Sequence, residues 1–352
     1  MSDSPMIVAV TGMNCQPENP GPGLAVVRSL RQEFGASIRI IGLSYDVLDA
    51  GLYLNEFCDA AYLLPYPSAG EQPLLQRLEQ IQQQEGMTIL IPCLDAELLN
   101  FIRLKDQLLA VGVHMVLPTR EQLLQRNKDR LDVLAAKADI RYPESKNISH
   151  NDFFYHCHDE GWRYPMVVKG LFYDAKVVYT PDEGAAAFRS IAAEWGLPVL
   201  VQRYAKGHEV NLVALGDGQG EMIGAVMMRK KAVTDKGKAW AAITIHDPHL
   251  EETARKLIKE LRWSGPLEVE ILKEESGQYL LIEINPRFPA WVYLATEAGV
   301  NLPAALVRMM QGEELTLAEP ETGKMMIRYA QETVIDLKTF ESMMMSGMHV
   351  PL

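Results

Sequence analysis

Clustered cysteines and long apolar runs are both missing from this sequence. Its 4 cysteines contain no CxxC pair, so neither a zinc site nor a disulfide framework is indicated. No apolar run approaches the roughly 18 residues that a membrane-spanning helix needs. The start, MSDSPM, lacks a basic segment followed by a long apolar core. We therefore expect a cytoplasmic, reduced protein without a membrane partner.

Positive charge is also scarce. The 352 residues include 34 Lys and Arg against 46 Asp and Glu, which gives a formal net charge of −12. Nucleic acids and anionic membrane surfaces reward basic patches, so neither is expected as a general partner. Any anionic small molecule must then be held by a local cluster of cations. The hydrophobic content of 48% is ordinary for a globular protein, and the length predicts two or three domains at roughly 150 residues per domain.

The first part of the chain alternates apolar runs with helical patterns. The apolar runs occupy 6–12, 37–43, 60–65, 87–92 and 113–118, and the helical patterns occupy 24–34, 71–85 and 95–110. This alternation predicts a parallel sheet with helices on both faces, which we assign to an α/β domain over 1–118. Ligands of such sheets gather at the carboxyl ends of the strands, where Asn14, Asp95 and Glu97 lie.

The remainder of the chain predicts mixed α+β structure. We expect a helical connector over 119–139, a small region of strands and one helix over 140–204, and longer antiparallel strands over 205–322. A tail over 323–352, with the strand-like run KMMIRYA, is expected to pack on the core.

The most informative feature is an acidic hairpin formed by PLEVEILK and YLLIEIN. If Ser276-Gly277 is a two-residue turn, 275 faces 278, 272 faces 281, Glu270 faces Glu283 and 268 faces 285. Side chains alternate along a strand, so these acidic and amide groups share one face. Opposed like charges destabilise a sheet and need a cation. Oxygen ligands without Cys or His suit magnesium, which also takes phosphate oxygens. A solvated acidic face is the simpler alternative.

Several cations are candidates for holding phosphate. Lys169 closes the apolar run VVK, where a buried ammonium group needs a partner, although a lysine reaching from an edge into solvent is the alternative. Lys128, taken alone, is typical of a solvated helix. Five cations lie between 229 and 238, either on a solvated loop or on a loop that folds over a triphosphate or an acidic substrate.

In chain order these features resemble the ATP-grasp superfamily of carboxylate–amine ligases. The elements are Lys128, Lys169, the segment 202–209, Glu270 and the motif EINPR at 283–287. The N-terminal half resembles enzymes like the carbamoyl-phosphate synthase large subunit, through GPGLAVVRSL, IPCLDAEL and LPTREQLLQRNKDRL. The resemblance covers about residues 6–330. It implies the ATP-grasp fold, with a pre-ATP-grasp domain, a lid subdomain over 140–204 and a catalytic subdomain over 205–322.

The resemblance also implies the roles of individual residues. For the nucleotide, it implies that phosphates meet Lys128 and Lys169, that adenine meets the segment Gln202, Arg203 and Tyr204, and that ribose meets Glu209. For the metal, Mg²⁺ or alternatively Mn²⁺, it implies the ligands Glu270, Glu283 and Asn285. It places Arg287 near the transferred phosphoryl group.

Two positions depart from the family's pattern. The stretch 170–176, GLFYDAK, has one glycine where many relatives have a glycine-rich loop over the phosphates. Gln202 stands where a carboxylate is frequent, which alters the contact with the adenine amine.

The expected reaction joins a small-molecule carboxylate to an amine. The carboxylate attacks the γ-phosphate of ATP to give an acyl phosphate, and an amine then displaces phosphate. Arg229 is a further candidate for stabilising the acyl phosphate, and an acidic pocket at Asp95 and Glu97 would favour a cationic amine such as an amino acid. A homodimer is compatible with this interpretation.

Three alternatives remain from the sequence. A nicotinamide-dependent dehydrogenase is disfavoured because the loop after the first apolar run does not match G-x-G-x-x-G. Carboxylation of biotin is nearer, but we expect no large extra domain after residue 330. An ATP-binding regulatory or scaffold protein of the same fold is the main alternative outside catalysis.

Overall fold

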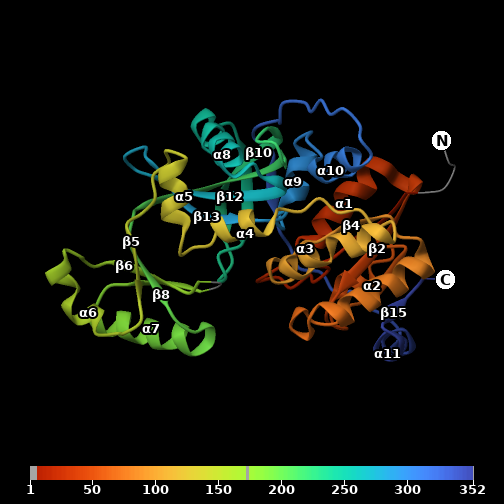
Figure 1. The fold of residues 1–352 in the computed structure, drawn as a ribbon, viewed down its shortest axis with the longest axis horizontal. Coiled ribbons are helices and arrows are strands. Elements are labelled where there is room, and N and C mark those ends of the chain that lie inside the picture. Colours follow the sequence, from red (N-terminus) through yellow and green to blue (C-terminus); the bar gives the residue numbers. More distant parts are fainter. Residues whose placement is uncertain (1–5, 172–173, 352) are drawn as a thin grey trace.

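The computed structural model describes residues 6–171 and 174–351. Phe172 and Tyr173 of the predicted lid loop, and residues 1–5, lie outside the described residues. The described residues form three sheets. In Figure 1 the N-terminal sheet lies at the right, a long antiparallel sheet lies in the upper middle, and a small sheet projects at the lower left.

The N-terminal sheet has the strand order β15-β3-β2-β1-β4. Its strands are β1 (Met6–Val10), β2 (Ile38–Ser44), β3 (Ala60–Leu63), β4 (Ile89–Ile91) and, antiparallel at the edge, β15 (Met348–His349). Strands β1 to β4 run parallel, and their short apolar sequences are buried on both faces. Val8 and Val10 pack toward α1 (Gly23–Phe34), whereas Ala9 packs toward α2 (Glu71–Glu85) and α3 (Asp95–Ala110). The predicted parallel sheet with helices on both faces is confirmed.

The fifth predicted strand, 113–118, is reduced to a single bridge beside β4. In this segment His114 forms an isolated bridge to Ile89, and the His114 amide donates to the Thr88 carbonyl over 2.8 Å. Val113, Met115 and Leu117 are nevertheless buried in the cluster under α2 and α3. The segment therefore pairs with β4 at one position only, and its alternating apolar side chains pack against the helices.

The connector consists of α4 (Arg120–Gln125) and α5 (Leu131–Lys137). Thr119 caps α4, because its hydroxyl accepts a hydrogen bond from the Gln122 amide. The Gln122 side chain in turn donates to the Leu261 carbonyl over 3.0 Å, which ties the connector to the long sheet's covering helix. Lys128 lies in the turn between the two helices and not within a helix.

The small sheet has the order β5-β8-β6-β7. Its strands are β5 (Ser145–Ile148), β6 (Met166–Lys169), β7 (Ala175–Val178) and β8 (Val199–Arg203). The helices α6 (Phe153–His156) and α7 (Pro181–Trp195) cover it, with Val168, Val201 and Ile191 in the shared core. The predicted region of strands and one helix over 140–204 is present, with α6 as an additional short helix. In β5 the only buried side chain is Ile148.

The long antiparallel sheet has the order β13-β12-β9-β10-β11-β14. Its strands are β9 (Gly207–Asp217), β10 (Met222–Val233), β11 (Ala239–Ile245), β12 (Ser264–Glu274), β13 (Tyr279–Asn285) and β14 (Met325–Ile327). On one face, Leu267, Val269 and Ile271 pack under α8 (Pro248–Leu261). On the other face, Val213 and Met228 share a core with α1, α9 (Val292–Glu297) and α10 (Leu302–Met310). This second face carries the acidic residues.

The tail joins two of the sheets. Its strand β14 extends the long sheet beside β11, and after α11 (Leu337–Ser346) its strand β15 pairs with β3. The Arg77 guanidinium donates to the Leu63 and Gly347 carbonyls and fixes this crossing.

The fold class, α/β combined with α+β, agrees with the prediction. In the described part of the chain, no helix is both long and apolar enough to cross a membrane.

Candidate active site

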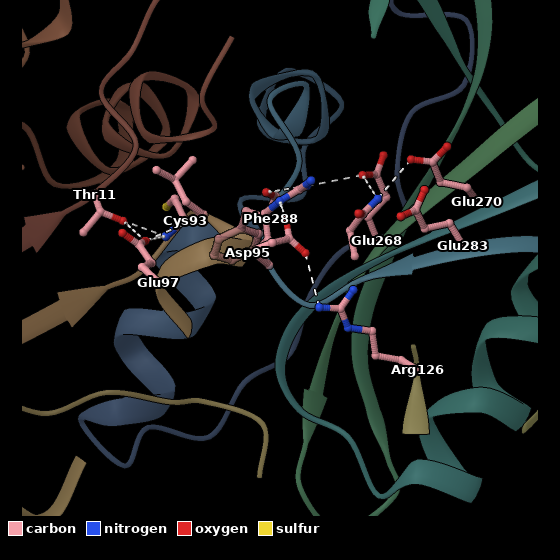
Figure 2. A network of polar contacts seen from close by, with 12 residues as sticks. Thr11, Cys93, Asp95, Glu97, Arg126, Glu268, Glu270, Glu283 and Phe288 are labelled. Atoms are coloured by element: carbon pink, nitrogen blue, oxygen red, sulfur yellow. Dashed lines mark hydrogen bonds and ion pairs between the residues drawn. The ribbon is translucent and has the colours of Figure 1, made fainter. Parts of the chain in front are cut away.

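The acidic hairpin forms with the predicted register at the end remote from its turn. Glu270 lies opposite Glu283, and Glu268 lies opposite Asn285, across β12 and β13. Their side chains share the face that packs toward the N-terminal domain. Figure 2 shows the carboxylates of Glu268, Glu270 and Glu283 close together.

Near the turn the predicted register is wrong. The Glu274 amide donates to the Gln278 carbonyl, so the loop has three residues, with Gly277 at a φ of 84°. Consequently Leu272 pairs with Leu280 instead of 281. A β-bulge between the 271–281 and 270–283 pairs inserts Ile282 and restores the predicted pairing beyond it.

Asn285 connects the carboxylates. Its amide nitrogen donates to Glu268 Oε2 and to Glu270 Oε1, each over 3.0 Å. With both amide hydrogens committed to carboxylates, the Asn285 Oδ1 oxygen is the atom left to face a cation. Glu268 is buried and accepts further hydrogen bonds from Asn211 and Trp291.

Lysines from separate parts of the chain neutralise the remaining charge. Lys230 on β10 forms ion pairs with Glu209 and, over 3.5 Å, with Glu270 Oε2. Lys128 from the connector lies 3.2 Å from Glu283 Oε1. Lys169 at the end of β6 donates to Gln202 Oε1 over 2.8 Å. The cations therefore arrive from the connector, the small sheet and the long sheet.

Burial and charge act against each other in this cluster. Burial and the neighbouring Glu270 raise the pKa of Glu268. Burial alone would also raise the pKa of Glu270, but Lys230, Lys238 and Arg287 hold it below its ordinary value. Burial and the charge of Lys128 lower the pKa of Lys169 to about 8, although nearby glutamates act in the opposite direction. The protonated Lys169 thus has too little negative charge around it, which favours the binding of an anion.

Arg287 is buried between carboxylates. Its Nε donates to Asp95 Oδ2 over 2.9 Å, and a terminal nitrogen lies 3.5 Å from Glu268 Oε2. Arg126 lies 3.5 Å from the other oxygen of Asp95, and Figure 2 shows Asp95 reached by Arg126. Burial would lower the pKa of Arg287, but Asp95 and Glu268 raise it above its ordinary value. Arg287 thus stays charged and ties the N-terminal domain to the long sheet.

The structure places Arg229 away from the acidic cluster. Arg229 lies opposite Val210, which faces the core under α8, whereas the next residue, Lys230, faces Glu270. This alternation speaks against the prediction that Arg229 serves the site. Lys230 is the cation that pairs with the cluster, and the sequence missed it because residues 229–233 were interpreted as loop.

The first half of the predicted basic loop, residues 229–233, is strand. Strand β10 continues to Val233, a short turn follows, and β11 begins at Ala239. The Thr234 hydroxyl donates to the Glu18 carbonyl over 2.9 Å, and the Asp235 amide donates to the Glu18 carboxylate. The loop after β1 therefore holds this hairpin over the acidic face.

The segment predicted to meet adenine, residues 202–204, is only partly directed toward the acidic cluster. Gln202 is buried and lies between Lys169 and the Ser145 hydroxyl. Arg203 points the other way, toward Glu144 and the Trp162 ring.

Tyr204 is exposed, whereas Glu209 is paired with a lysine. Tyr204, with 41% of its surface accessible, follows the end of β8. Glu209, on the acidic face of β9, is engaged by Lys230.

The proposed acidic pocket near α3 is not acidic. Glu97 is fully buried and accepts hydrogen bonds from Thr11, from Tyr45 and from the Cys93 and Leu94 amides. Burial raises the pKa of Glu97 above its ordinary value, against these hydrogen bonds.

Asp95 and Asn14, the neighbouring candidate residues, also have polar partners within the protein. Asp95 is neutralised by Arg287 and Arg126. Asn14 accepts a hydrogen bond from the Gly21 amide within its own loop. These groups already have partners within the chain, which speaks against the expected cationic amine at Asp95 and Glu97.

The residues present fit a magnesium ion that is shared with phosphate. Within 6–171 and 174–351, no three His, Cys, Asp or Glu side chains converge as a preformed cage. Magnesium does not require one, since it commonly uses one or two carboxylates and takes its remaining ligands from phosphate and water. Glu270, Glu283 and the Asn285 oxygen provide this kind of incomplete set.

Solved structures share this arrangement of sheets. The biotin carboxylase domain of Hydrogenobacter thermophilus 2-oxoglutarate carboxylase, a dimer in complex with MgADP, ADP and bicarbonate, matches with a TM-score of 0.68 at 15% identity, over 91% of this chain and 73% of that one. A biotin carboxylase–β-γ-ATP complex from Campylobacter jejuni matches with a TM-score of 0.67 at 14% identity, over 89% and 72%. An L-amino acid ligase from Bacillus licheniformis matches with a TM-score of 0.61 at 14% identity, over 88% and 74%. Residues 197–333 also match a family model described as ATP-grasp in the biosynthetic pathway with Ter operon.

This protein has the ATP-grasp fold. The resemblance deduced from EINPR and the lysines is therefore confirmed. The ATP-grasp family model covers β8 to β14, the part of the chain that carries Glu268, Glu270 and the EINPR motif. At these low identities, the solved structures support the fold, and the chemistry must be argued from the residues themselves.

Proposed function

We propose that this ATP-grasp protein is an ATP-dependent carboxylate–amine ligase that acts through an acyl phosphate and releases ADP and phosphate. One observation carries the proposal: Glu270 and Glu283 oppose each other beside Asn285, with Lys128 and Lys230 paired to them. A hairpin that places like charges face to face is unfavourable unless it binds cations. Lys169, with its lowered pKa, adds a cation suited to an anionic ligand.

Each group has a role in the proposed reaction. Glu270, Glu283 and Asn285 would hold Mg²⁺ or Mn²⁺, which supplies charge neutralisation at the phosphate oxygens. Lys128 and Lys169 would bind phosphates as point charges. We keep Gln202 to Tyr204 as the adenine segment. Glu209, now paired with Lys230, would exchange this partner for ribose.

The chemistry needs positioning more than covalent help from the protein. A substrate carboxylate oxygen attacks the γ-phosphorus, the bond from that phosphorus to the ADP oxygen breaks, and ADP leaves. An amine nitrogen then attacks the acyl carbon, the bond to the phosphate oxygen breaks, and the amine loses a proton. Lys169, Lys230 and Arg287 would neutralise the transferred phosphoryl group in a site that is largely closed to water.

The division of the chain gives each part a function in this proposal. The region 140–204 would act as a lid that protects the intermediate from water, and 205–322 would carry the chemistry. The likeness to an L-amino acid ligase favours amino-acid or peptide-like substrates. The family model that matches residues 197–333 is described as ATP-grasp in a biosynthetic pathway, which supports a biosynthetic role in this proposal. A cytoplasmic location and a homodimer remain parts of the proposal.

The test is a screen for ADP release with pools of carboxylic acids and amines. We expect release that requires both substrates and Mg²⁺, and a loss of at least about 100-fold in the Glu283→Gln variant, comparable to removing a group that stabilises the transition state. Glu275→Gln removes one charge from the exposed turn of the same hairpin and serves as the matched control. Tight nucleotide binding without turnover in any pool would contradict the ligase and support the regulatory alternative.

A further inference from the structure

Each carboxylate oxygen of Glu268 faces two donor groups. Within the described residues, Oε1 accepts from Asn211 over 2.9 Å and from Trp291 over 2.6 Å. Oε2 accepts from Asn285 over 3.0 Å and lies 3.5 Å from the Arg287 guanidinium. These partners come from β9, from β13 and from the segment that follows β13. Both oxygens are committed to donors, so Glu268 is poorly placed to bind a metal itself.

The bond to Asn285 decides which atom of that amide faces the cluster. The Asn285 nitrogen has two hydrogens, which go to Glu268 and to Glu270. Rotating the amide by half a turn would place its oxygen against two carboxylates. Glu268 therefore helps to fix Oδ1 as the atom directed at a cation.

The bond to Arg287 fixes a second group. The Arg287 guanidinium is planar, and its Nε and one terminal nitrogen are directed at Asp95 and Glu268. These two contacts fix the plane of the guanidinium group, and hence the direction of its remaining nitrogen. One carboxylate thus orients an amide and a guanidinium that lie two residues apart in the EINPR motif.

We propose that Glu268 is a positioning residue, which orients Asn285 toward the metal and Arg287 toward the transferred phosphoryl group. This inference rests on the proposed function. Asn211 and Trp291 serve Glu268 by holding its other oxygen. Since the sequence placed Glu268 on this face without a role, the role comes from its contacts alone.

The test compares Glu268→Gln with Asp247→Asn. Asp247 is a buried carboxylate that accepts from Lys273 and Tyr279 under the opposite face of the same sheet, so it reports the cost of changing a buried carboxylate. We expect Glu268→Gln to weaken Mn²⁺ binding in the presence of ADP by about 10- to 100-fold, as changes behind a ligating side chain do. The measurement is electron paramagnetic resonance of free and bound Mn²⁺. Asp247→Asn should leave Mn²⁺ affinity unchanged.

A second variant covers the case in which Glu268→Gln does not fold. Trp291→Phe removes one donor to Oε1 and keeps an aromatic ring, and it should weaken Mn²⁺ binding less than tenfold while lowering kcat more than it raises KM. Unchanged Mn²⁺ affinity in a folded Glu268→Gln protein, or, if that variant does not fold, in Trp291→Phe, would overturn the inference. If the unaltered protein binds no Mn²⁺ with ADP, the proposed function itself fails, and the inference with it.

Discussion

Replacing Lys169 by methionine is expected to stabilise the free protein and weaken ATP binding. Lys169 ends β6, where burial and the charge of Lys128 lower its pKa from 10.5 to about 8. The unfolded chain therefore holds this proton more tightly than the folded one. The resulting cost to folding is fully present below pH 8 and shrinks as the pH rises from 8 toward 10.5.

The magnitude follows from the shift. At about 1.4 kcal/mol per pKa unit, the change from 10.5 to about 8 corresponds to about 3 kcal/mol. The variant also loses the hydrogen bond to Gln202, and this loss reduces the gain in stability by about 1 kcal/mol. We expect the free energy of unfolding to rise by about 2 kcal/mol at pH 7, and this gain to fall below half at pH 9.5, as measured by urea denaturation.

Nucleotide binding should move in the opposite direction. Removing a charged group that binds phosphate costs about 1.5–3 kcal/mol, so the ATP dissociation constant should rise by about 10- to 100-fold at pH 7. For the unaltered protein, ATP affinity should fall as the pH rises through 8, because the free ammonium loses its proton. Isothermal titration calorimetry at pH 7 and pH 9 measures both effects.

Lys176→Met provides the control, since Lys176 lies exposed on the neighbouring strand β7. It should change neither stability nor ATP affinity appreciably. A Lys169→Met protein that is less stable at pH 7 and binds ATP normally would refute the reasoning that Lys169 is a buried cation awaiting phosphate.

Further predictions concern the surroundings of the cluster. Lys230→Met should lower the free energy of unfolding, measured by urea denaturation, by about 3 kcal/mol, because it leaves Glu270 buried without a close cation. Lys230→Met should also abolish ADP release, whereas Arg229→Met should retain it. Equal losses of ADP release in the two variants would show that the faces of β10 are misassigned. Asp95→Asn should lower kcat with little change in nucleotide affinity, because it frees Arg287; a change confined to nucleotide affinity would argue against this. Gly277→Ala should cost about 1 kcal/mol in urea denaturation, because the turn needs a positive φ there; an unchanged midpoint would contradict the three-residue turn.

Local patterns in the sequence predicted the main elements well. Alternation and turn residues found the acidic hairpin, and the opposition of Glu270 and Glu283 is confirmed. The turn itself was wrong, because a three-residue loop and a two-residue loop share the Ser-Gly signal. The bulge at Ile282 restored the register, and nothing in YLLIEIN distinguishes a bulged strand from a regular one.

The wrong site residues have a different cause. Which of Arg229 and Lys230 faces Glu270 can be deduced only if β10 continues past both residues. The cations at the end of β10 were interpreted as a loop, in which side chains do not alternate. The roles of Asp95 and Glu97 depend on partners from distant parts of the chain, such as Arg287 and Tyr45. A carboxylate near a strand end is equally consistent with a substrate pocket and with a structural anchor until those partners are placed.

The charges of the cluster suggest an exchange of partners on binding. In the free protein, Lys128 and Lys230 neutralise Glu283 and Glu270. A divalent cation would take over these carboxylates and leave the lysines short of negative charge, and the phosphates of a nucleotide would supply it. A metal ion alone, or a nucleotide alone, leaves one set of charges uncompensated in a largely buried site, which is costly. Because linkage is reciprocal, each ligand must then strengthen the binding of the other by the same factor. In the proposed function, this coupling would allow lysines and carboxylates that already pair with one another to serve as a binding site instead of a permanent structural network.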